Sequence, residues 1–157
     1  MATKFICDGM LGKLCKNLRI CGIDTLYSNQ GMAILLEARK QNRIILTRNT
    51  HLREKNDIYF IQTSNSVTQL KKVIKQYNLQ NKIQLFSRCI ECNYMLKSVS
   101  KESVRDKVPY FTYKNFNEFA LCPQCQKVYW KGSHYKNMIK DIKHLVANCK
   151  FQISDCE

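Results

Sequence analysis

The chain has 157 residues, 45% of them hydrophobic, which is enough for one ordinary core together with a small metal-stabilised module. Its 26 Lys and Arg against 12 Asp and Glu give a formal net charge of +14, which favours a polyanion, nucleic acid in particular, as its partner. No apolar run approaches the roughly 20 residues of a membrane span and no secretory signal is visible, so we expect no membrane association and an intracellular protein, cytoplasmic or nuclear.

Residues 1–82 alternate strand and helix patterns, which predicts an α/β domain with a mostly parallel sheet flanked by helices. We expect strands at residues 4–7, 23–27, 43–47 and 58–61, and helices at 10–21 and 32–41. Gly22 fits a C-cap of the first helix. Ser66 and Gln69 fit a capping box at the start of a third helix that includes Tyr77.

The first helix has two chemically different faces. Its apolar face holds Leu11, Leu14, Cys15, Leu18 and Cys21, and its opposite face holds Lys13, Lys16, Asn17 and Arg19. We therefore expect a core side and a basic, solvent-facing side. In the second and third helices, the residues expected to face inward include Met32, Leu35, Leu36 and Ala38, and then Val67, Leu70, Val73 and Ile74.

Polar residues follow the first three strands of the predicted sheet. They are Asp8, then Ser28 with Asn29, and then Arg48 with Asn49. Because the carboxyl ends of parallel strands share one edge, we expect these side chains to lie along a common crevice. A carboxylate cluster at such a place supports metal-assisted phosphodiester hydrolysis. Taken alone, however, Asp8 is better explained as the N-cap of the helix that follows it.

Two C-x-x-C pairs, Cys89 with Cys92 and Cys122 with Cys125, predict one four-sulfur zinc site. Four thiolates leave no position for a substrate, so we expect the zinc to be structural. The spacer, residues 93–121, is longer than that of a zinc finger and suits a ribbon with a strand-rich connection. Four unliganded cysteines and two disulfides are the alternatives. The remaining cysteines are expected to be reduced thiols: Cys7, Cys15, Cys21, Cys149 and Cys156.

Aromatic residues form two groups around the second cysteine pair. The first group comprises Tyr110, Phe111, Tyr113, Phe116 and Phe119. Because a small ribbon has little other apolar material, we expect most of these rings to pack beneath the zinc, with base stacking as the weaker alternative. The second group interleaves basic and aromatic side chains, as in platforms that stack unpaired bases, and comprises Tyr129, Trp130, Lys131, His134 and Tyr135. His134 is alternatively a helix cap or a further zinc ligand. A final helix is expected at residues 135–148, with Met138, Ile142 and Leu145 inward.

Several of these motifs, in this order, resemble the Mut-seven C-terminal ribonuclease-domain family. The resemblance covers about residues 4 to 140. The segments that carry it are Phe5-Ile6-Cys7-Asp8-Gly9 with its continuation to Arg19, Gly22-Ile23-Asp24-Thr25-Leu26-Tyr27, Arg43-Ile44-Ile45-Leu46-Thr47-Arg48, Gln69-Leu70, Ser87-Arg88-Cys89 to Asn93, Val108-Pro109, and Cys122-Pro123 to Tyr135.

The resemblance implies a PIN-like nuclease domain joined to a zinc ribbon, RNA as the substrate, Mg²⁺ or Mn²⁺ as the cofactor, and acidic metal ligands at the strand ends. Asp8 matches the aspartate of the first strand, but Asn49 stands where a second aspartate is expected, and residues 28–31 replace an acidic cluster. An amide carries no negative charge, so we expect a divalent cation to bind weakly. Glu37 is a candidate replacement ligand, and so are Glu54 and Asp57.

We therefore expect a PIN-like domain at residues 1–82, a zinc ribbon with a C-terminal helix at 83–150 and a tail at 151–157. The expected function is RNA binding, with metal-dependent cleavage that is weakened by the missing ligands. The catalytic candidates are Asp8, Asn49 and Glu37, and the phosphate-contacting candidates are Lys13, Lys16, Arg19 and Arg48. A catalytically inactive RNA-binding module and a zinc-stabilised protein-interaction adaptor are the alternatives.

Overall fold

The computed structural model describes residues 2–53 and 56–154, with side chains described as far as residue 147. The first half of the chain forms a four-stranded parallel sheet in the order β2-β1-β3-β4. The strands are β1 (Phe5–Cys7), β2 (Thr25–Tyr27), β3 (Ile44–Thr47) and β4 (Ile58–Phe60). The expected parallel α/β architecture is confirmed, with strands one to two residues shorter than the sequence pattern indicates.

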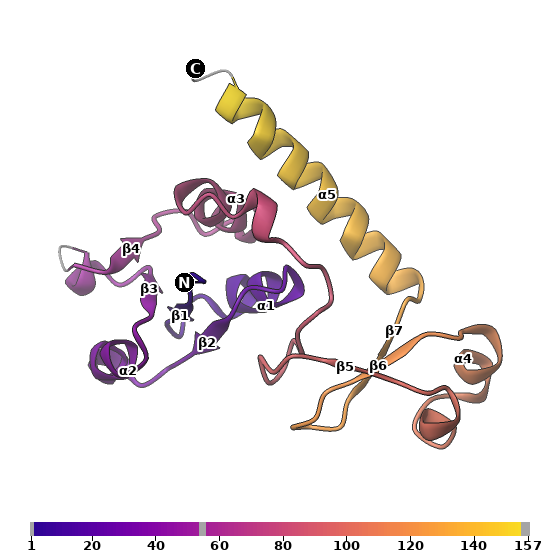
Figure 1. The fold of residues 1–157 in the computed structure, drawn as a ribbon. Coiled ribbons are helices and arrows are strands. Elements are labelled where there is room, and N and C mark those ends of the chain that lie inside the picture. Colours follow the sequence, from indigo (N-terminus) through magenta and orange to yellow (C-terminus); the bar gives the residue numbers. More distant parts are fainter. Residues whose placement is uncertain (1, 54–55, 155–157) are drawn as a thin grey trace.

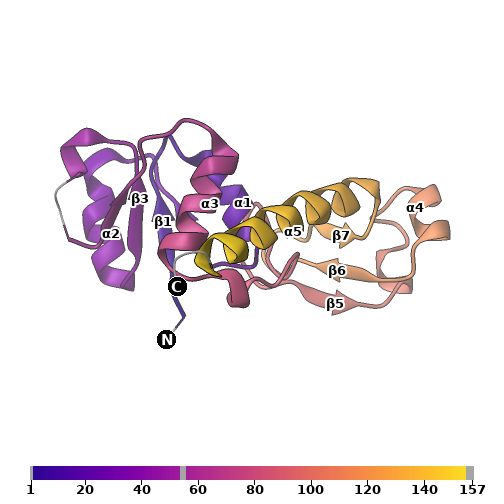
Figure 2. The same ribbon diagram turned by 90° about the horizontal axis from the view of Figure 1, so that it is seen from above.

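Helices cover both faces of this sheet (Figure 2). They are α1 (Gly12–Ile20) and α3 (Ser66–Gln76) on one face and α2 (Ile34–Gln41) on the other. Alternate residues of β1 supply the two cores, since Phe5 and Cys7 pack with α1 and α3 while Ile6 packs with Ile34 and Ala38 of α2. Among the described residues, no helix is both long and apolar enough to cross a membrane.

The start of α2 differs from the sequence-based expectation. A 3₁₀ turn at Gly31–Ala33 precedes the helix, which begins at Ile34 rather than at Met32. The tighter turn changes the phase of the helix, so its buried residues are Ile34 and Ala38. Met32 and Leu36, which we expected to face inward, are 52% and 61% exposed. The expectation was therefore wrong for these two residues.

The start of α3 also differs, by one position. Its N-cap is Asn65, whose side-chain oxygen accepts a hydrogen bond of 2.9 Å from the Thr68 N–H. Gln69 is buried and donates from Nε2 to the Thr63 carbonyl at 2.8 Å. The capping box expected from Ser66 and Gln69 is therefore wrong, and Val67, expected to face inward, is 59% exposed.

The C-cap of α1 is Cys21 rather than Gly22, and Gly22 comes one position later with φ of +80°, the conformation that ends the helix. It also permits a close approach of the chain that leads to the ribbon. A Cβ on Gly22 would lie 2.4 Å from the Gln84 backbone oxygen. The Gln84 N–H donates to the Cys21 carbonyl, and the Phe86 N–H donates to the Ile20 carbonyl. The end of α1 and the linker therefore form one backbone contact that a larger residue would disrupt.

The second half of the chain contains a small antiparallel sheet in the order β5-β6-β7, which follows the first cysteine pair. Its strands are β5 (Lys97–Val99), β6 (Phe119–Leu121) and β7 (Val128–Trp130). The connection between β5 and β6 holds a short helix, α4 (Tyr110–Asn115), at the end of the ribbon farthest from the parallel sheet (Figure 1). Phe119 is buried as expected, whereas Tyr110 and Phe111 are 77% and 71% exposed, so the expectation that they pack beneath the cysteines is wrong.

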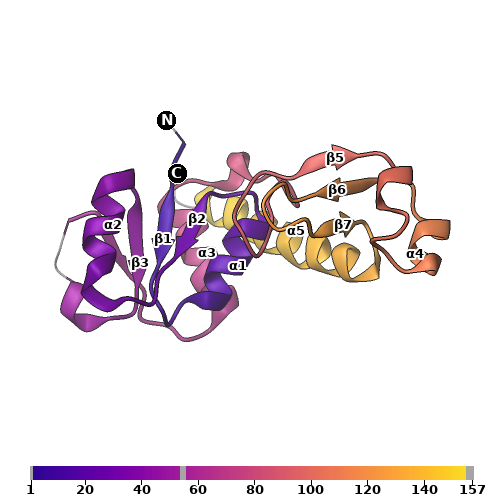
Figure 3. The same ribbon diagram turned by 90° about the horizontal axis from the view of Figure 1, so that it is seen from below.

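The last helix, α5 (Ser133–Ser154), starts beside β7 and runs back to the parallel sheet, where it packs against α3 (Figure 3). Ile142 and Leu145 join the core on that face, and Met138 packs against it, as expected. The helix is longer than the sequence pattern indicates, so the predicted tail begins inside it, and residues 155–157 lie outside the described part of the chain. The division of the chain at residues 82 and 83 stays a prediction.

A buried arginine joins the two halves. Arg19 of α1 donates from Nε to the Thr25 carbonyl at 2.8 Å, and from Nη1 to the carbonyls of Ile90 at 2.9 Å and Glu91 at 3.2 Å. The expectation that Arg19 faces solvent is therefore wrong, since only 9% of the residue is exposed. The physical reason is that the second half of the chain covers this side of α1 and offers carbonyl oxygens that satisfy the guanidinium.

Asp24 provides a second polar connection. Its carboxylate accepts hydrogen bonds of 2.7 Å from Arg43, directly before β3, and from the side-chain amide of Asn93, in the ribbon. The Asn93 side chain in turn accepts from the Thr25 N–H at 3.0 Å. Burial alone would raise the pKa of Asp24, but the hydrogen bonds and the positive charge of Arg43 outweigh it and hold that pKa below its ordinary value.

We predict that Asp24→Asn destabilises the fold by about 1–3 kcal/mol at pH 7, because the largely buried Arg43 guanidinium loses its charged partner. The folded-state pKa of Asp24 is depressed, so its stabilising contribution is present above the unfolded pKa of about 4 and is lost as pH falls through the folded value. The difference between natural protein and variant should therefore shrink toward pH 3 in urea unfolding curves.

The matched control is Asp106→Asn, which removes an exposed carboxylate. It should leave stability within about 0.5 kcal/mol of the natural protein at every pH. A stability loss for Asp24→Asn that stays constant between pH 7 and pH 3 would show that the carboxylate charge is not the cause.

Candidate nucleic-acid site and metal centre

The carboxyl ends of β1 and β3 lie side by side at the point where the chain changes direction across the sheet. From β1 the chain moves to β2 on one side and then to β3 on the other, which is the switch point where α/β sheets form their binding crevice. The Asp8 N–H donates to the Leu46 carbonyl, and the Ser28 N–H donates to the Cys7 carbonyl. The residues that follow the first three strands therefore share one edge, as expected.

Thr47, the last residue of β3, links Asp8 to Asn49. The Thr47 hydroxyl donates to the Asp8 carboxylate, and the same oxygen accepts the Asn49 N–H at 2.9 Å. Asp8 also accepts the Met10 N–H at 3.2 Å. Sequence patterning assigned no role to Thr47, although its position directly before Arg48 and Asn49 is the signal that could have indicated one.

Asp8 is not the N-cap of α1. The N-cap is Leu11, and no side chain caps this helix end, so the N-cap explanation of Asp8 is wrong. Asn49, by contrast, is an N-cap. It precedes the 3₁₀ turn Thr50–Leu52, and its side-chain oxygen accepts a hydrogen bond of 3.0 Å from the His51 N–H. Asp8 and Asn49 thus share a hydrogen-bonded edge, but each already has polar partners there.

The other acidic candidates do not form a cluster with Asp8. Glu37 lies half-buried in the first turn of α2. Asp57 precedes β4, and its carbonyl accepts from the N–H of Ile45 in β3, so it lies at the opposite edge of the sheet from Asp8. Glu54 lies outside the described residues. Across residues 2–53 and 56–147, the one group of three or more His, Cys, Asp or Glu side chains close enough to share an ion is the four cysteines.

The basic candidates beside this edge differ in accessibility. Lys13 and Lys16 are exposed on α1, where they line a shallow hollow of about 660 Å³ together with Tyr27. Arg48 is half-buried and donates from Nη2 to the Gln62 carbonyl at 3.1 Å. Its Nε is buried and has no hydrogen-bond partner within the described part of the chain. Lys13 and Lys16 therefore have free access to solvent, whereas Arg48 has less.

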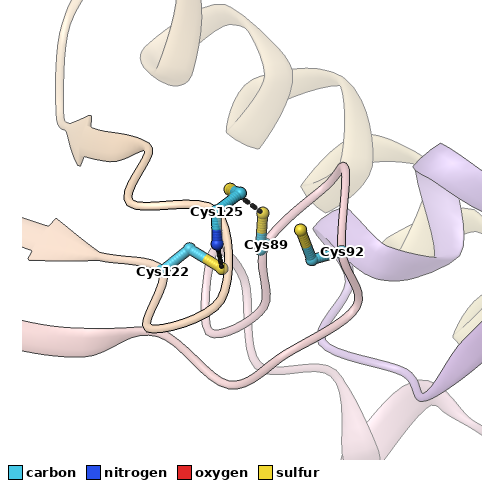
Figure 4. A group of neighbouring side chains, drawn as sticks. All are labelled: Cys89, Cys92, Cys122 and Cys125. Carbon is cyan, nitrogen blue, oxygen red and sulfur yellow. Dashed lines mark hydrogen bonds between the residues drawn. The ribbon is translucent and has the colours of Figure 1, made fainter.

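The four predicted cysteine ligands come together in the ribbon (Figure 4). Their sulfur atoms all lie within 4.8 Å of one another, and the Sγ atoms of Cys89 and Cys125 are 3.7 Å apart. A tetrahedral site with metal–sulfur bonds of about 2.3 Å places its sulfurs about 3.8 Å apart. All four cysteines are free thiols, so they form no disulfides, and the cluster has the donor set and size to hold one metal ion.

Each C-x-x-C turn is closed by the same backbone geometry. In the first turn, the Cys89 carbonyl accepts the Asn93 N–H, and in the second, the Cys122 carbonyl accepts the Gln126 N–H. Asn93 and Gln126 both adopt positive φ, of 69° and 66°, which turns the chain back beneath the sulfurs. The two turns are therefore equivalent structures that aim their thiols at one point.

The thiols of the cluster differ in acidity. Burial raises the pKa of Cys89, but hydrogen bonds from the Tyr129 hydroxyl and from the backbone of Cys92 and Glu91 outweigh it and lower that pKa to about 7. Burial and the neighbouring Cys125 thiol raise the pKa of Cys92 to about 12. Four adjacent thiolates repel one another, and a bound dication relieves that repulsion.

The aromatic and basic residues after the second cysteine pair are partly used in packing. The Tyr129 hydroxyl lies 3.2 Å from the Cys89 sulfur and accepts the Ile90 N–H at 3.1 Å. The Tyr135 ring packs on Phe86 with centroids 4.0 Å apart. Trp130 is half-buried in β7. The exposed members of the group are His134 and Lys131. Lys131 forms an ion pair of 3.2 Å with Glu118.

The structure thus contains two separate candidate sites, the polar edge of the parallel sheet and the four-cysteine centre of the ribbon. The family model described as "Mut7-C RNAse domain" matches residues 3–142, which include both sites and the first part of α5. No curated protein and no solved structure matches the chain. Because the family model matches most of the sequence, from the first strand to the last helix, the chain belongs to the Mut7-C RNAse domain family.

Proposed function

We propose that the protein binds RNA as a PIN-like ribonuclease-type domain, and that its divalent-metal-dependent cleavage is weakened. The observation that carries this proposal is the composition of the switch-point edge. There the Asp8 carboxylate is linked through Thr47 to the neutral amide of Asn49, and among the described residues Asp8 belongs to no group of three or more His, Cys, Asp or Glu side chains close enough to share an ion.

These donors fit Mg²⁺ or Mn²⁺ poorly. Hard divalent cations take several oxygen ligands, and carboxylates supply both oxygen atoms and the compensating charge. Asp8 already accepts hydrogen bonds from Thr47 and Met10, and the Asn49 side-chain oxygen accepts one from His51. Glu37, half-buried on α2, is the remaining candidate ligand. An ion at this edge would therefore be held weakly, which favours binding without efficient cleavage.

The charge distribution supports RNA as the partner. The net charge is +14, and Lys13 and Lys16 project from α1, which begins at the same edge as Asp8. Arg48 follows β3 at that edge. The second candidate surface is the group of Tyr129, Trp130, Lys131, His134 and Tyr135, in which Lys131 and His134 are the exposed members. Cationic side chains beside a crevice contact phosphates without reading sequence.

A catalytically inactive RNA-binding module and a zinc-stabilised interaction adaptor are the competing functions. Strong salt dependence of binding distinguishes RNA binding of either kind from the adaptor, because the release of counterions reports phosphate contacts. Metal-dependent cleavage then distinguishes the weakened nuclease from the inactive module. The membership in an RNAse-domain family favours the two RNA-binding functions over the adaptor.

We also propose that the ion held by Cys89, Cys92, Cys122 and Cys125 is structural zinc. Zn²⁺ prefers a tetrahedral set of thiolates, and four protein ligands leave it no position for substrate. The free energy of metal binding at such a site contributes to the folding of the ribbon.

Freshly purified, untreated protein should therefore contain one equivalent of zinc by elemental analysis. Chelation should unfold the ribbon, and the fluorescence of Trp130, the one tryptophan of the sequence, reports that region because it lies in β7. Adding zinc, but not magnesium, should restore the signal. A zinc content below half an equivalent would count against the proposal.

Replacing both Lys13 and Lys16 by Glu should weaken RNA binding without unfolding the protein, because both side chains are exposed. The slope of log affinity against log salt should decrease by about 0.7 for each single-strand phosphate contact that is lost. Arg19 is left unchanged, because it is buried between the two halves of the chain.

The matched control for this double variant replaces Arg39 and Lys40 by Glu. These residues are exposed in the last turn of α2, on the opposite face of the sheet, and give the same change in net charge. Equal losses of affinity in both double variants would mean that overall charge, and not the α1 surface, governs binding.

Asn49→Asp should increase both Mn²⁺ affinity and RNA cleavage. Aspartate keeps the N-cap contact with the His51 N–H, so the local fold should persist. The added charge attracts a dication with about 1–4 kcal/mol per unit charge pair at 4 Å, enough for a tenfold or greater change in affinity. Mn²⁺ titration and cleavage of a labelled RNA are the measurements.

Adding Asp8→Asn to the Asn49→Asp variant is the control, and it should remove the gain. If the natural protein already cleaves RNA briskly with Mn²⁺ and Asn49→Asp changes nothing, the metal is bound by other residues and the proposed weakening is wrong.

A further inference from the structure

Two neighbouring aromatic side chains on α4 lie in open solvent. Tyr110 is 77% exposed and Phe111 is 71% exposed, the highest values among the exposed large hydrophobic side chains of the described residues. A small ribbon has little apolar material, so leaving two large rings outside its core forgoes burial energy. Such a patch indicates a surface that contacts a partner.

The exposure follows from how α4 packs. Its inward side uses Thr112, which is buried, and Tyr113, whose ring lies 5.0 Å below the ammonium of Lys101. The backbone is held by hydrogen bonds, since the Tyr113 N–H donates to the Pro109 carbonyl and the Asn115 side chain donates to the Phe111 carbonyl. The two rings therefore project from a fixed backbone, which limits the conformational entropy lost when a partner binds.

Exposed basic residues outnumber exposed acidic ones in the segment that leads to the two rings and along α4. Lys114 is exposed and lies four positions after Tyr110 and three after Phe111, so it shares their side of the helix. Arg105 and Lys107 are also exposed in the segment between β5 and α4, which holds two exposed acidic residues, Glu102 and Asp106. A planar apolar surface next to cations matches the chemistry of unpaired nucleotides, which present flat bases and negative phosphates.

The other aromatic group in the ribbon is less available. The Tyr129 hydroxyl contacts the cysteine cluster, and the Tyr135 ring packs on Phe86. Helix α4 also lies at the end of the ribbon farthest from the parallel sheet in all three views (Figures 1, 2 and 3). A contact there is therefore separate from the edge that holds Asp8.

We propose that Tyr110 and Phe111 form a stacking platform for unpaired RNA bases, with Lys107 and Lys114 contacting the adjoining phosphates. This inference rests on the proposed RNA-binding function and extends it to a second, distant contact. Bases of a duplex are already stacked and covered, so the platform selects single-stranded RNA.

The test compares the natural protein with a double Ala variant and a double Leu variant at Tyr110 and Phe111. Binding is measured by fluorescence anisotropy with a labelled oligouridine and with an RNA duplex of the same length. Leu keeps the patch apolar but removes the rings, so it separates stacking from a general hydrophobic contact. Tyr94→Ala, which removes a 52% exposed ring elsewhere in the ribbon, is the matched control.

Both double variants should bind oligouridine at least about fivefold more weakly, with an unchanged salt slope and unchanged duplex binding. Tyr94→Ala should bind like the natural protein. Unchanged zinc content and circular dichroism confirm that the variants are folded.

Four outcomes would overturn the inference. If the α4 variants bind oligouridine normally while the Lys13 and Lys16 double variant binds weakly, the platform is wrong but the proposed function stands. If the natural protein binds neither RNA, the proposed function fails as well. If the Leu variant binds oligouridine normally while the Ala variant binds weakly, the patch contacts RNA through general hydrophobic burial and stacking is wrong. If the natural protein self-associates through this patch in sedimentation experiments and the Ala variant does not, the patch is a protein contact.

Discussion

The buried guanidinium of Arg19 is the contact on which the arrangement of the two halves depends. It spans from α1 to the first cysteine turn, since Ile90 and Glu91, whose carbonyls it reaches, are the two residues between Cys89 and Cys92. A buried guanidinium without hydrogen-bond acceptors would be costly. The Arg19 guanidinium has its full set of acceptors only when the first cysteine turn is in place. Formation of the cysteine cluster therefore affects the packing of α1 on the sheet as well as the ribbon. Asp24 and Asn93 strengthen the same junction.

This junction also determines which basic residues of α1 are available. Arg19 is used internally, whereas Lys13 and Lys16 remain exposed one or two turns closer to the strand ends. The edge beside them holds Asp8 and a neutral Asn49 rather than a group of carboxylates. With little negative charge at the crevice, phosphates can approach the lysines without a bridging cation. The lack of a carboxylate group, on which the proposed weakening of metal-dependent cleavage rests, thus also favours direct binding of a polyanion.

Some aromatic residues of the ribbon pack inside it, and others are exposed on its surface. Tyr129 hydrogen-bonds with Cys89 and the backbone of Ile90 and so supports the cysteine centre, while Phe119 is buried in β6. Tyr110 and Phe111 are exposed, because α4 is one short helix with room for a single packed side. The amino-acid composition does not distinguish the buried rings from the exposed ones. Their different accessibility comes from the path of the chain between β5 and β6.

The sequence by itself determined the parallel α/β class, the side of α5 that joins the core, the four cysteine ligands and the family. These depend on periodicity and spacing along the chain, which local geometry enforces: alternating residues of a strand face opposite sides, and each C-x-x-C turn brings two sulfurs together. Only the tertiary structure decided the burial of Arg19, the exposure of Tyr110 and Phe111, and the link from Asp8 through Thr47 to Asn49. Each of these depends on partners far away in the sequence, and no local pattern specifies which distant carbonyl, hydroxyl or ring will be adjacent.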